Sequence, residues 1–339
     1  MQLVHGSNLR QKETQRTKDR DAVSRAYLSE IRTEYDRWHN ANVTLLGPGR
    51  TPAADDAAIV QQRVALFEQY KTFLDQQQYA EKFDSRSNLH SSALEEFMYY
   101  LFRDLVAGFG PHTLIGKSHT FKDLFFVPPS YAAMLRRPYA QVGIKDHDFV
   151  IGTTVQAAFR SSTPLPDLAE QADPEPSTAP PAVVGGPAAG DIPGEMTAIA
   201  VEKPLDYAVE TVTADTETRL FDVPVIAIEC KTYLDKAMLE GSSRAAEELK
   251  ARNPNGLYIV VMERIKLSEA VNLRKYKVDQ IYVLRQQKNT DREFTFAAGY
   301  VRNPIDPAVV WHLYDLVRSH LTRDWVIGLE QGIRRGYLL

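Results

Sequence analysis

The 339-residue sequence contains a single cysteine, Cys230. An intramolecular disulfide is therefore impossible, and zinc sites built on pairs of cysteines are excluded. No run of about 18 apolar residues occurs, which excludes a membrane-spanning helix, and the polar first twenty residues do not resemble a secretory leader. With 44% hydrophobic and 25% charged residues, we expect a soluble globular protein of the cytoplasm, where thiols stay reduced.

The chain also lacks an excess of basic residues. Its formal net charge is −4, which is poor for a protein that binds a polyanion, because Lys and Arg neutralise the phosphates. The acidity is concentrated, however: residues 162–222 hold 12 acidic and 2 basic residues, so the remainder carries a net charge of +6. Nucleic-acid binding is therefore not excluded.

Two segments before the middle of the chain have a helical pattern. Apolar residues recur at helical spacing over residues 8–40 and 55–83, which predicts two long amphipathic helices separated by a turn at Gly47-Pro48-Gly49. Residues 162–195, by contrast, hold eight prolines, and such a composition cannot bury enough apolar surface to fold. We expect a helical N-terminal region over residues 1–85 and a second domain over residues 86–339, interrupted by a flexible acidic insert at 162–195.

After the insert the pattern changes to α/β. Residues 223–228 and 257–261 are apolar runs typical of buried strands, and residues 234–251 between them predict a helix. A strand, a crossover helix and a second strand favour parallel pairing. Residues 280–284 predict a further strand, and Asp306-Pro307 predicts the N-cap and first turn of a helix that ends near residue 321.

Charged residues follow the expected strand at 223–228. Because strand side chains alternate, Glu229 and Lys231 share one side and Cys230 takes the other. The carboxyl ends of parallel strands are where α/β proteins bind ligands. The alternative interpretation is a solvated strand end with an incidental ion pair.

A second charged cluster, Lys145-Asp146-His147-Asp148, runs directly into the apolar residues 149–151. Asp148 stands where its carboxylate could face Glu229 across adjacent strands. Two carboxylates and a backbone carbonyl form an incomplete oxygen shell, which Mg²⁺ accepts while it keeps waters and binds a substrate phosphate. A nearby lysine can orient the attacking water and stabilise the developing charge. These residue types fit hydrolysis of a phosphodiester.

A third candidate lies on an expected helix over residues 91–102. Ser92-x-x-Glu95 matches a capping box, and Leu94, Met98 and Leu101 form an apolar stripe. Glu95 lies at the edge of this stripe, whereas Glu96 lies nearly opposite its centre. Glu95 is therefore a candidate catalytic residue, with a helix cap as the alternative role.

Together these segments resemble the active site of PD-(D/E)XK nucleases, in which an Asp precedes an apolar strand and a buried strand ends in Glu-x-Lys. The longer sequence segments 90–97, 145–152 and 228–236 resemble the corresponding segments of type II restriction endonucleases of that superfamily. The resemblance implies an α/β fold with a central mixed β-sheet flanked by helices. It also implies Asp148, Glu229 and the backbone carbonyl of Cys230 as ligands of Mg²⁺, and Lys231 as the group that positions the nucleophilic water.

The sequence departs from the family pattern in two places. His147 stands where the family has proline, and 81 positions separate Asp148 from Glu229, which is long for the motif. The insert accounts for much of this length. Asp206 and Asp222 remain alternatives for the first aspartate, although the odd offset of Asp222 from Glu229 would place it on the opposite strand face.

The resemblance further implies double-stranded DNA as the substrate, cut at a specific sequence as part of a restriction-modification system. Lys236 and Arg244, just beyond the Glu-x-Lys segment, are the expected DNA contacts. The helical region would serve recognition or dimerisation, and a homodimer or higher homo-oligomer would supply one active site to each DNA strand. A repair or recombination nuclease of the same superfamily, and a non-catalytic DNA-binding protein of the same fold, are the alternatives.

Overall fold

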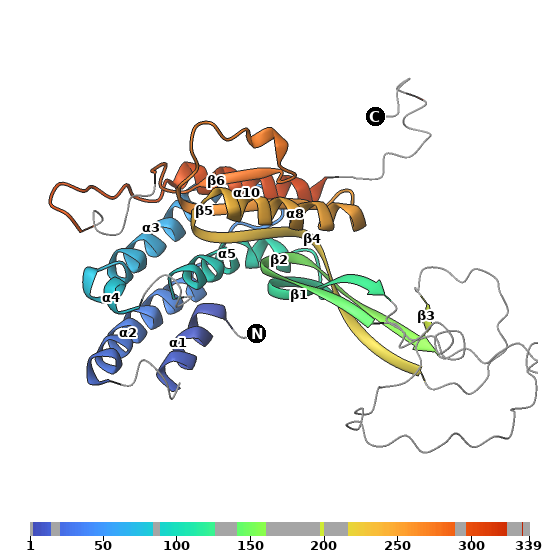
Figure 1. Cartoon of the computed structure of the whole chain (residues 1–339), viewed down its shortest axis with the longest axis horizontal. Coiled ribbons are helices and arrows are strands. Elements are labelled where there is room, and N and C mark those ends of the chain that lie inside the picture. Colours follow the sequence, from blue (N-terminus) through green and yellow to red (C-terminus); the bar gives the residue numbers. More distant parts are fainter. Residues whose placement is uncertain are drawn as a thin grey trace, which may run out of the picture. The chain divides into compact units, whose positions relative to one another are not determined.

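The computed structural model describes residues 3–14, 21–83, 89–125, 141–160, 197–199, 216–288, 296–323 and 334 (Figure 1). The helices before the sheet are α1 (Val4–Thr14), α2 (Ala22–Thr44), α3 (Asp56–Leu74), α4 (Gln77–Lys82) and α5 (Leu89–Ala107). The later ones are α8 (Lys236–Arg252), the short 3₁₀ helix η2 (Leu273–Lys275) and α10 (Pro307–Thr322). The strands are β1 (Thr113–Phe125), β2 (Gln141–Arg160), β3 (Thr197–Ile199), β4 (Thr216–Leu234), β5 (Leu257–Ile265) and β6 (Gln280–Val283).

The strands form one mixed sheet in the order β3-β2-β1-β4-β5-β6, and β2 also pairs with β4. The pairs β1–β4, β4–β5 and β5–β6 are parallel, whereas β2–β3 is antiparallel. Helix α8 connects β4 to β5, which confirms the predicted strand, crossover helix and strand. A mixed sheet flanked by helices is the fold class that the sequence predicted.

The chain forms two compact units. The first comprises Met1–Thr120, Asp146–Thr153 and Asp222–Leu339, and the second comprises Phe121–Lys145 and Thr154–Phe221. Helices α1 to α5 therefore belong to the same unit as β5, β6, α8 and α10. The predicted insert at 162–195 lies outside the described residues, and the roles predicted for residues 1–85 stay predictions. No helix of the described part is long and apolar enough to cross a membrane.

The two long helices predicted near the N-terminus are each divided in the structure. Asp21 is the N-cap of α2, since its carboxylate accepts a hydrogen bond from the Ser24 backbone N–H at 2.9 Å, so the segment predicted as one helix over 8–40 contains a helix start. The second segment contains α3, which ends at Leu74, and then α4. Helix α10 begins as predicted: the Asp306 carboxylate accepts from the Ala308 N–H at 2.8 Å.

The predicted capping box on α5 is wrong. The helix begins at Leu89, so Ser92 lies inside its first turn, where its hydroxyl contacts Nδ1 of His5 at 2.9 Å. The expectation for Glu96, opposite the apolar stripe, also needs correction, because α5 is buried around most of its circumference and Glu96 is only 1% exposed. A single amphipathic stripe does not describe a helix that is packed on several sides.

Glu96 instead caps a different helix. The backbone N–H groups of His5 and Gly6, in the first turn of α1, donate to Glu96 Oε2 at 2.9 and 3.1 Å, and the Tyr100 hydroxyl donates to Oε1 at 2.7 Å. A carboxylate at a helix N-terminus pairs with the positive end of the helix dipole and with unpaired N–H groups. Glu96 therefore fastens α1 to α5.

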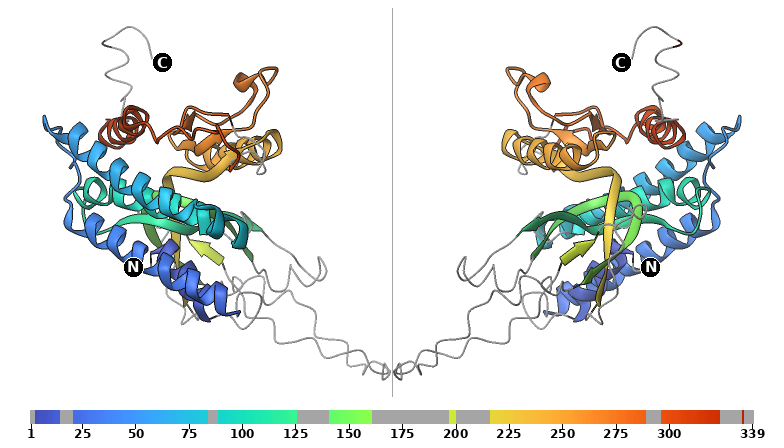
Figure 2. Two further views of the ribbon diagram at one scale, coloured as in Figure 1. Left: turned by 90° about the vertical axis from the view of Figure 1, so that its left-hand side faces the viewer. Right: turned by 90° about the vertical axis from the view of Figure 1, so that its right-hand side faces the viewer.

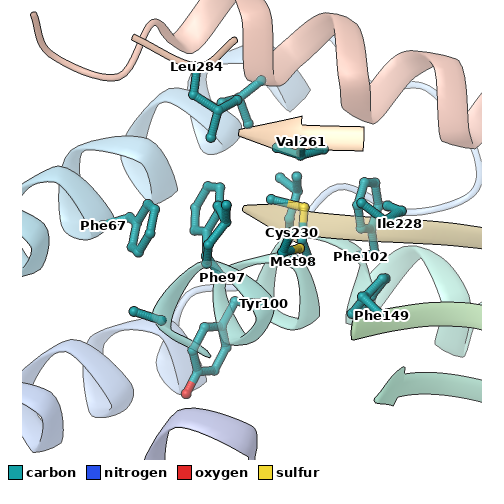
Figure 3. Packing of buried hydrophobic residues seen from close by; sticks show 14 of the residues in the cluster. Phe67, Phe97, Met98, Tyr100, Phe102, Phe149, Ile228, Cys230, Val261 and Leu284 are labelled. Carbon is teal, nitrogen blue, oxygen red and sulfur yellow. The ribbon is translucent and has the colours of Figure 1, made fainter. Parts of the chain in front are cut away.

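Helices cover both faces of the sheet in the first unit. One cluster packs Phe97 and Phe102 of α5 against Ile228 and Cys230 of β4, together with Phe67 of α3 (Figure 3). The second cluster packs α8 against Ala227 and other residues on the opposite face of the same strands. Figure 2 shows α8 and α3 on opposite sides of β4. The alternation in β4 follows the sequence prediction, so Glu229 and Lys231 share the α8 face.

A buried ionic network joins α3 to the end of β5. Glu263 on β5 is 2% exposed, and its carboxylate contacts Lys71 Nζ at 3.0 Å and Arg285 Nε at 3.1 Å. Arg285 also reaches Glu68 of α3 at 2.8 Å, and Glu68 in turn contacts Arg302 at 3.0 Å. Asp75 contacts Lys71 at 3.1 Å and Arg302 at 2.7 Å, so three cations face three carboxylates. Buried ions are tolerated when their charges are balanced in this way.

His5 makes folding sensitive to acid. Burial, followed by the charge of Lys71, lowers the pKa of His5 well below its ordinary value of 6.5, and its ring nitrogens contact Ser92 at 2.9 Å and Tyr70 at 2.5 Å. Because the unfolded chain binds the proton more readily, stability is lost as pH falls below 6.5, by at most about 1.4 kcal/mol per pH unit. Between about pH 7.5 and 5.5, wild type should lose roughly 1.4 kcal/mol more unfolding free energy than His5→Phe in urea titrations. Parallel losses in the two proteins would contradict this assignment.

Candidate active site

Glu229 and Lys231 lie near the carboxyl end of β4, on the face covered by α8. Lys231 Nζ is 3.0 Å from Glu229 Oε1, and their side chains are 26% and 22% exposed. Cys230 between them is buried on the opposite face, as its place in the alternation requires. The strand thus holds a carboxylate and an ammonium side by side, and both are partly exposed to solvent.

Asp148 reaches this pair from β2. At Gly152, a Cβ atom would lie 2.1 Å from the Val223 carbonyl oxygen, so only glycine allows β2 to approach β4 this closely. Four residues earlier, Asp148 Oδ2 accepts a hydrogen bond from the Cys230 N–H at 3.0 Å and lies 3.1 Å from Lys231 Nζ. The structure therefore brings together Asp148, Glu229 and Lys231, all within the first unit.

The three charges stabilise one another. Burial opposes the charge on Lys231, but the carboxylates of Asp148 and Glu229 outweigh it and raise the pKa of Lys231 above its ordinary value. Burial likewise works to raise the pKa of Glu229, and the Lys231 ammonium outweighs it and lowers that pKa. A cation held between two carboxylates shows that this position favours positive charge.

Tyr258 is a site residue that the sequence reasoning missed. It lies on β5, is 2% exposed, and its hydroxyl donates to Glu229 Oε2 at 2.7 Å. Its backbone N–H donates to Asp279 at 2.7 Å, and the ring of His147, which replaces the family's proline, packs against it edge-on with centroids 6.1 Å apart. The available signal was a phenol in an apolar strand, since a buried hydroxyl needs a polar partner.

Glu95 stands apart from these residues. Its side chain is 8% exposed, its Oε2 has no hydrogen-bond partner in the described part of the chain, and Lys117 Nζ lies 3.8 Å away. Both residues line a cavity of about 380 Å³. Burial, and then the charge of Asp148, raises the pKa of Glu95 to about 7. Glu95 thus senses Asp148 electrostatically without a hydrogen bond to it.

The other predicted site residues lie elsewhere. Asp206 falls outside the described residues. Asp222 lies seven positions before Glu229 on β4, where its carboxylate accepts a hydrogen bond from the Ser118 hydroxyl at 2.5 Å. Lys236 and Arg244 are exposed on α8, with Lys236 3.8 Å from Glu240. None of the contacts described for them reaches the Asp148, Glu229 and Lys231 cluster.

The donor set suits a hard divalent cation. No group of three or more His, Cys, Asp and Glu residues that could hold a metal occurs within the described ranges. Two carboxylates around a position that already attracts a cation, next to the backbone of Cys230, offer only oxygen ligands in small number. Mg²⁺ is typically bound in this way, with water and substrate phosphate as its remaining ligands.

Comparison with known proteins matches a family model and solved structures. The family model described as Bpu10I restriction endonuclease matches residues 205–327, a range that contains Glu229, Lys231 and Tyr258. This match over part of the chain points to a type II restriction endonuclease. No curated protein sequence matches the chain.

Among solved structures, this chain resembles a chain of the "native BbvCI A2B2 tetramer at low resolution". The TM-score is 0.59 and the sequence identity is 17%, and the match covers 95% of this chain and 97% of the other. At this identity the likeness shows a shared fold that extends over nearly the whole chain. Restriction endonucleases act on DNA and generally use a divalent metal.

Proposed function

We propose that this chain is a type II restriction endonuclease that hydrolyses double-stranded DNA at a specific sequence with Mg²⁺, using Asp148, Glu229 and Lys231. The observation that carries the proposal is the Lys231 ammonium within 3.1 Å of carboxylates from two different strands. A structural ion pair would need one carboxylate. Two carboxylates and one lysine, partly open to solvent near the carboxyl end of β4, supply both a cation site and a charged group for the reacting phosphate.

In the proposed mechanism, Asp148, Glu229 and the Cys230 carbonyl would hold the cation, whose Lewis acidity polarises the phosphate when it is bound. Lys231 donates hydrogen bonds to the attacking water and to a phosphate oxygen. As the water oxygen bonds to phosphorus and the P–O bond to the leaving oxygen breaks, the ammonium stabilises the added negative charge. Glu95, whose pKa is raised to about 7 by burial and by the charge of Asp148, is the candidate acceptor of the proton that the attacking water releases, and the leaving oxygen takes up a proton from solvent.

A digestion experiment tests the proposal. Purified protein is incubated with phage DNA in Mg²⁺ or in EDTA, and the products are separated on a gel. Discrete fragments in Mg²⁺ alone are expected. A smear would contradict sequence specificity and favour a repair or recombination nuclease, and DNA that stays intact in Mg²⁺ at every salt concentration would favour a non-catalytic DNA-binding protein.

Assembly follows from the need to cut two strands. A chain with one such site can cut both strands of a duplex when two sites act together, which favours an oligomer. The similar BbvCI chain comes from an A2B2 tetramer, which supports an oligomer. We propose a homodimer or higher homo-oligomer, and mass photometry with and without target DNA distinguishes it from a monomer. The proposed location is the cytoplasm, which the single cysteine supports.

Tyr258→Phe tests whether the phenol positions Glu229. Loss of the 2.7 Å hydrogen bond leaves Glu229 Oε2 free to turn, so we expect the Mg²⁺ concentration for half-maximal cleavage to rise about tenfold, with a smaller change in rate at saturating Mg²⁺. The matched control is Tyr282→Phe on β6, whose hydroxyl contacts His312 at 2.8 Å and should leave the Mg²⁺ requirement unchanged. An equal shift in both variants would indicate a general packing effect.

A further inference from the structure

Strands β4 and β5 continue beyond Lys231 toward their ends. Lys231 pairs with Met262 of β5, and two residues further Tyr233 pairs with Arg264. The Glu263 carboxylate, between Met262 and Arg264, is buried against Lys71 of α3. The side chains depart from strict alternation at these ends, because Leu234 and Ile265 pack in the cluster beside α8.

Spacing along the strand places these residues close to the reacting centre. Two residues of a strand span about 7 Å, and neighbouring strands lie about 4.8 Å apart. Tyr233 therefore lies about 7 Å beyond Lys231 along β4, with Arg264 beside it. A DNA strand that lies over Lys231 and follows β4 toward its end therefore passes close to these residues.

The cluster contains two cations for which no ion pair within 4.0 Å occurs in the described part of the chain. Arg264 is half-buried, and its buried Nε makes no hydrogen bond. Lys266 is exposed, and its Nζ lies over the Tyr233 ring, 5.5 Å from the centroid. Its backbone N–H donates to the Leu234 carbonyl at 2.9 Å, which fixes the residue beside the end of β4. The nearby Asp235 carboxylate caps α8 instead, accepting from the Met238 N–H at 2.8 Å.

Such an arrangement suits a phosphate. A guanidinium presents fixed donors, a lysine supplies a mobile charge, and the aromatic ring holds that lysine over the strand end. Arg264 alone is half-buried, and a half-buried guanidinium without an ion pair is costly unless a ligand supplies the opposite charge. Neither residue was among the basic residues that the sequence pattern singled out, because only the strand register relates them to Lys231.

We propose that Arg264, Lys266 and Tyr233 bind a backbone phosphate of the DNA next to the one that is cleaved. This inference rests on the proposed function. A contact of these residues with a backbone phosphate would fix the position of the DNA but would not depend on its base sequence. Removing it should weaken binding to specific and non-specific duplexes alike.

The test measures DNA affinity in EDTA, so that cleavage does not interfere. Binding of a fluorescently labelled duplex is followed by anisotropy over a series of NaCl concentrations, for wild type, Arg264→Gln, Lys266→Ala and the double variant. Each single variant should bind about tenfold more weakly. The slope of log affinity against log salt should fall in magnitude by about 1 in each single variant and by about 2 in the double variant.

Two controls separate charge from folding. Arg252→Ala removes an exposed cation at the opposite end of α8 and should leave the slope unchanged. Arg264→Lys keeps the charge and should retain most of the slope that Arg264→Gln loses. If Arg264→Lys and Arg264→Gln lose the same amount of salt slope, Arg264 has a structural role and the phosphate site is overturned.

The outcomes also separate this inference from the proposed function. An unchanged salt slope in Arg264→Gln and Lys266→Ala, with normal cleavage by wild type, would overturn the phosphate site alone. Reduced slopes in an enzyme that does not cleave would support the phosphate site and contradict the proposed catalysis. A wild-type protein with no affinity for DNA would overturn both.

Discussion

Lys231→Ala is expected to lower the rate of DNA cleavage by about 1,000-fold at saturating Mg²⁺. The Lys231 ammonium contacts both Asp148 and Glu229, at 3.1 and 3.0 Å. Its removal takes away the group that stabilises charge on the phosphate, and added Mg²⁺ cannot replace that interaction. The measurement is the single-turnover rate on a duplex that contains the target site.

The matched control for this prediction is Lys288→Ala. Lys288 is exposed and pairs with Glu269 at 3.0 Å on the surface, so its loss should leave the cleavage rate unchanged. DNA binding in EDTA distinguishes lost chemistry from lost affinity, and we expect Lys231→Ala to bind DNA with little change. Retention of a tenth or more of the wild-type rate would contradict a direct role of Lys231 in the reaction.

Arg285→Met should destabilise the protein by about 3–5 kcal/mol. Arg285 is 1% exposed and contacts both Glu263 and Glu68, so its loss leaves two carboxylates with weaker compensation, and Glu263 is itself almost fully buried. Methionine fills a similar length of space but carries no charge. The free energy of unfolding is measured by urea titration near neutral pH.

The comparison for Arg285→Met is Arg252→Ala, an exposed substitution expected to change stability by less than about 0.5 kcal/mol. A second variant, Arg285→Met with Glu263→Gln, removes the opposing charge as well. If unpaired charge causes the loss, the double variant should recover part of the stability. A loss below about 1 kcal/mol in Arg285→Met would show that the network is dispensable for folding.

The features that the sequence predicted correctly depend on local rules. Alternation along one strand was enough to place Glu229 and Lys231 together and to turn Cys230 to the core. The Asp306 cap and the parallel pairing across α8 also follow from neighbouring residues and from the length of one crossover. These expectations required no knowledge of contacts between distant segments.

The expectations that failed depended on partners far away in the sequence. Ser92-x-x-Glu95 has the spacing of a capping box, but the helix begins earlier, and the buried carboxylate that caps a helix is Glu96, some 90 residues after Gly6. Arg285 and Glu68 are 217 positions apart. Tyr258 is related to Glu229 only through the register of β5 against β4. No local sequence pattern predicts contacts between residues so far apart in the chain.

The alternation of buried and site-facing side chains along β4 also determines which insertions, deletions and substitutions this protein can tolerate as its sequence diverges. Ile228 and Cys230 belong to the packed interior, whereas Glu229 and Lys231 belong to the reacting surface, and the two sets interleave residue by residue. A one-residue insertion or deletion within β4 would turn both carboxylate and ammonium into the apolar layer beneath α5. We therefore expect natural variants of this enzyme to change length in the loops around β4 and to substitute, but never to add or remove, residues within 226–231.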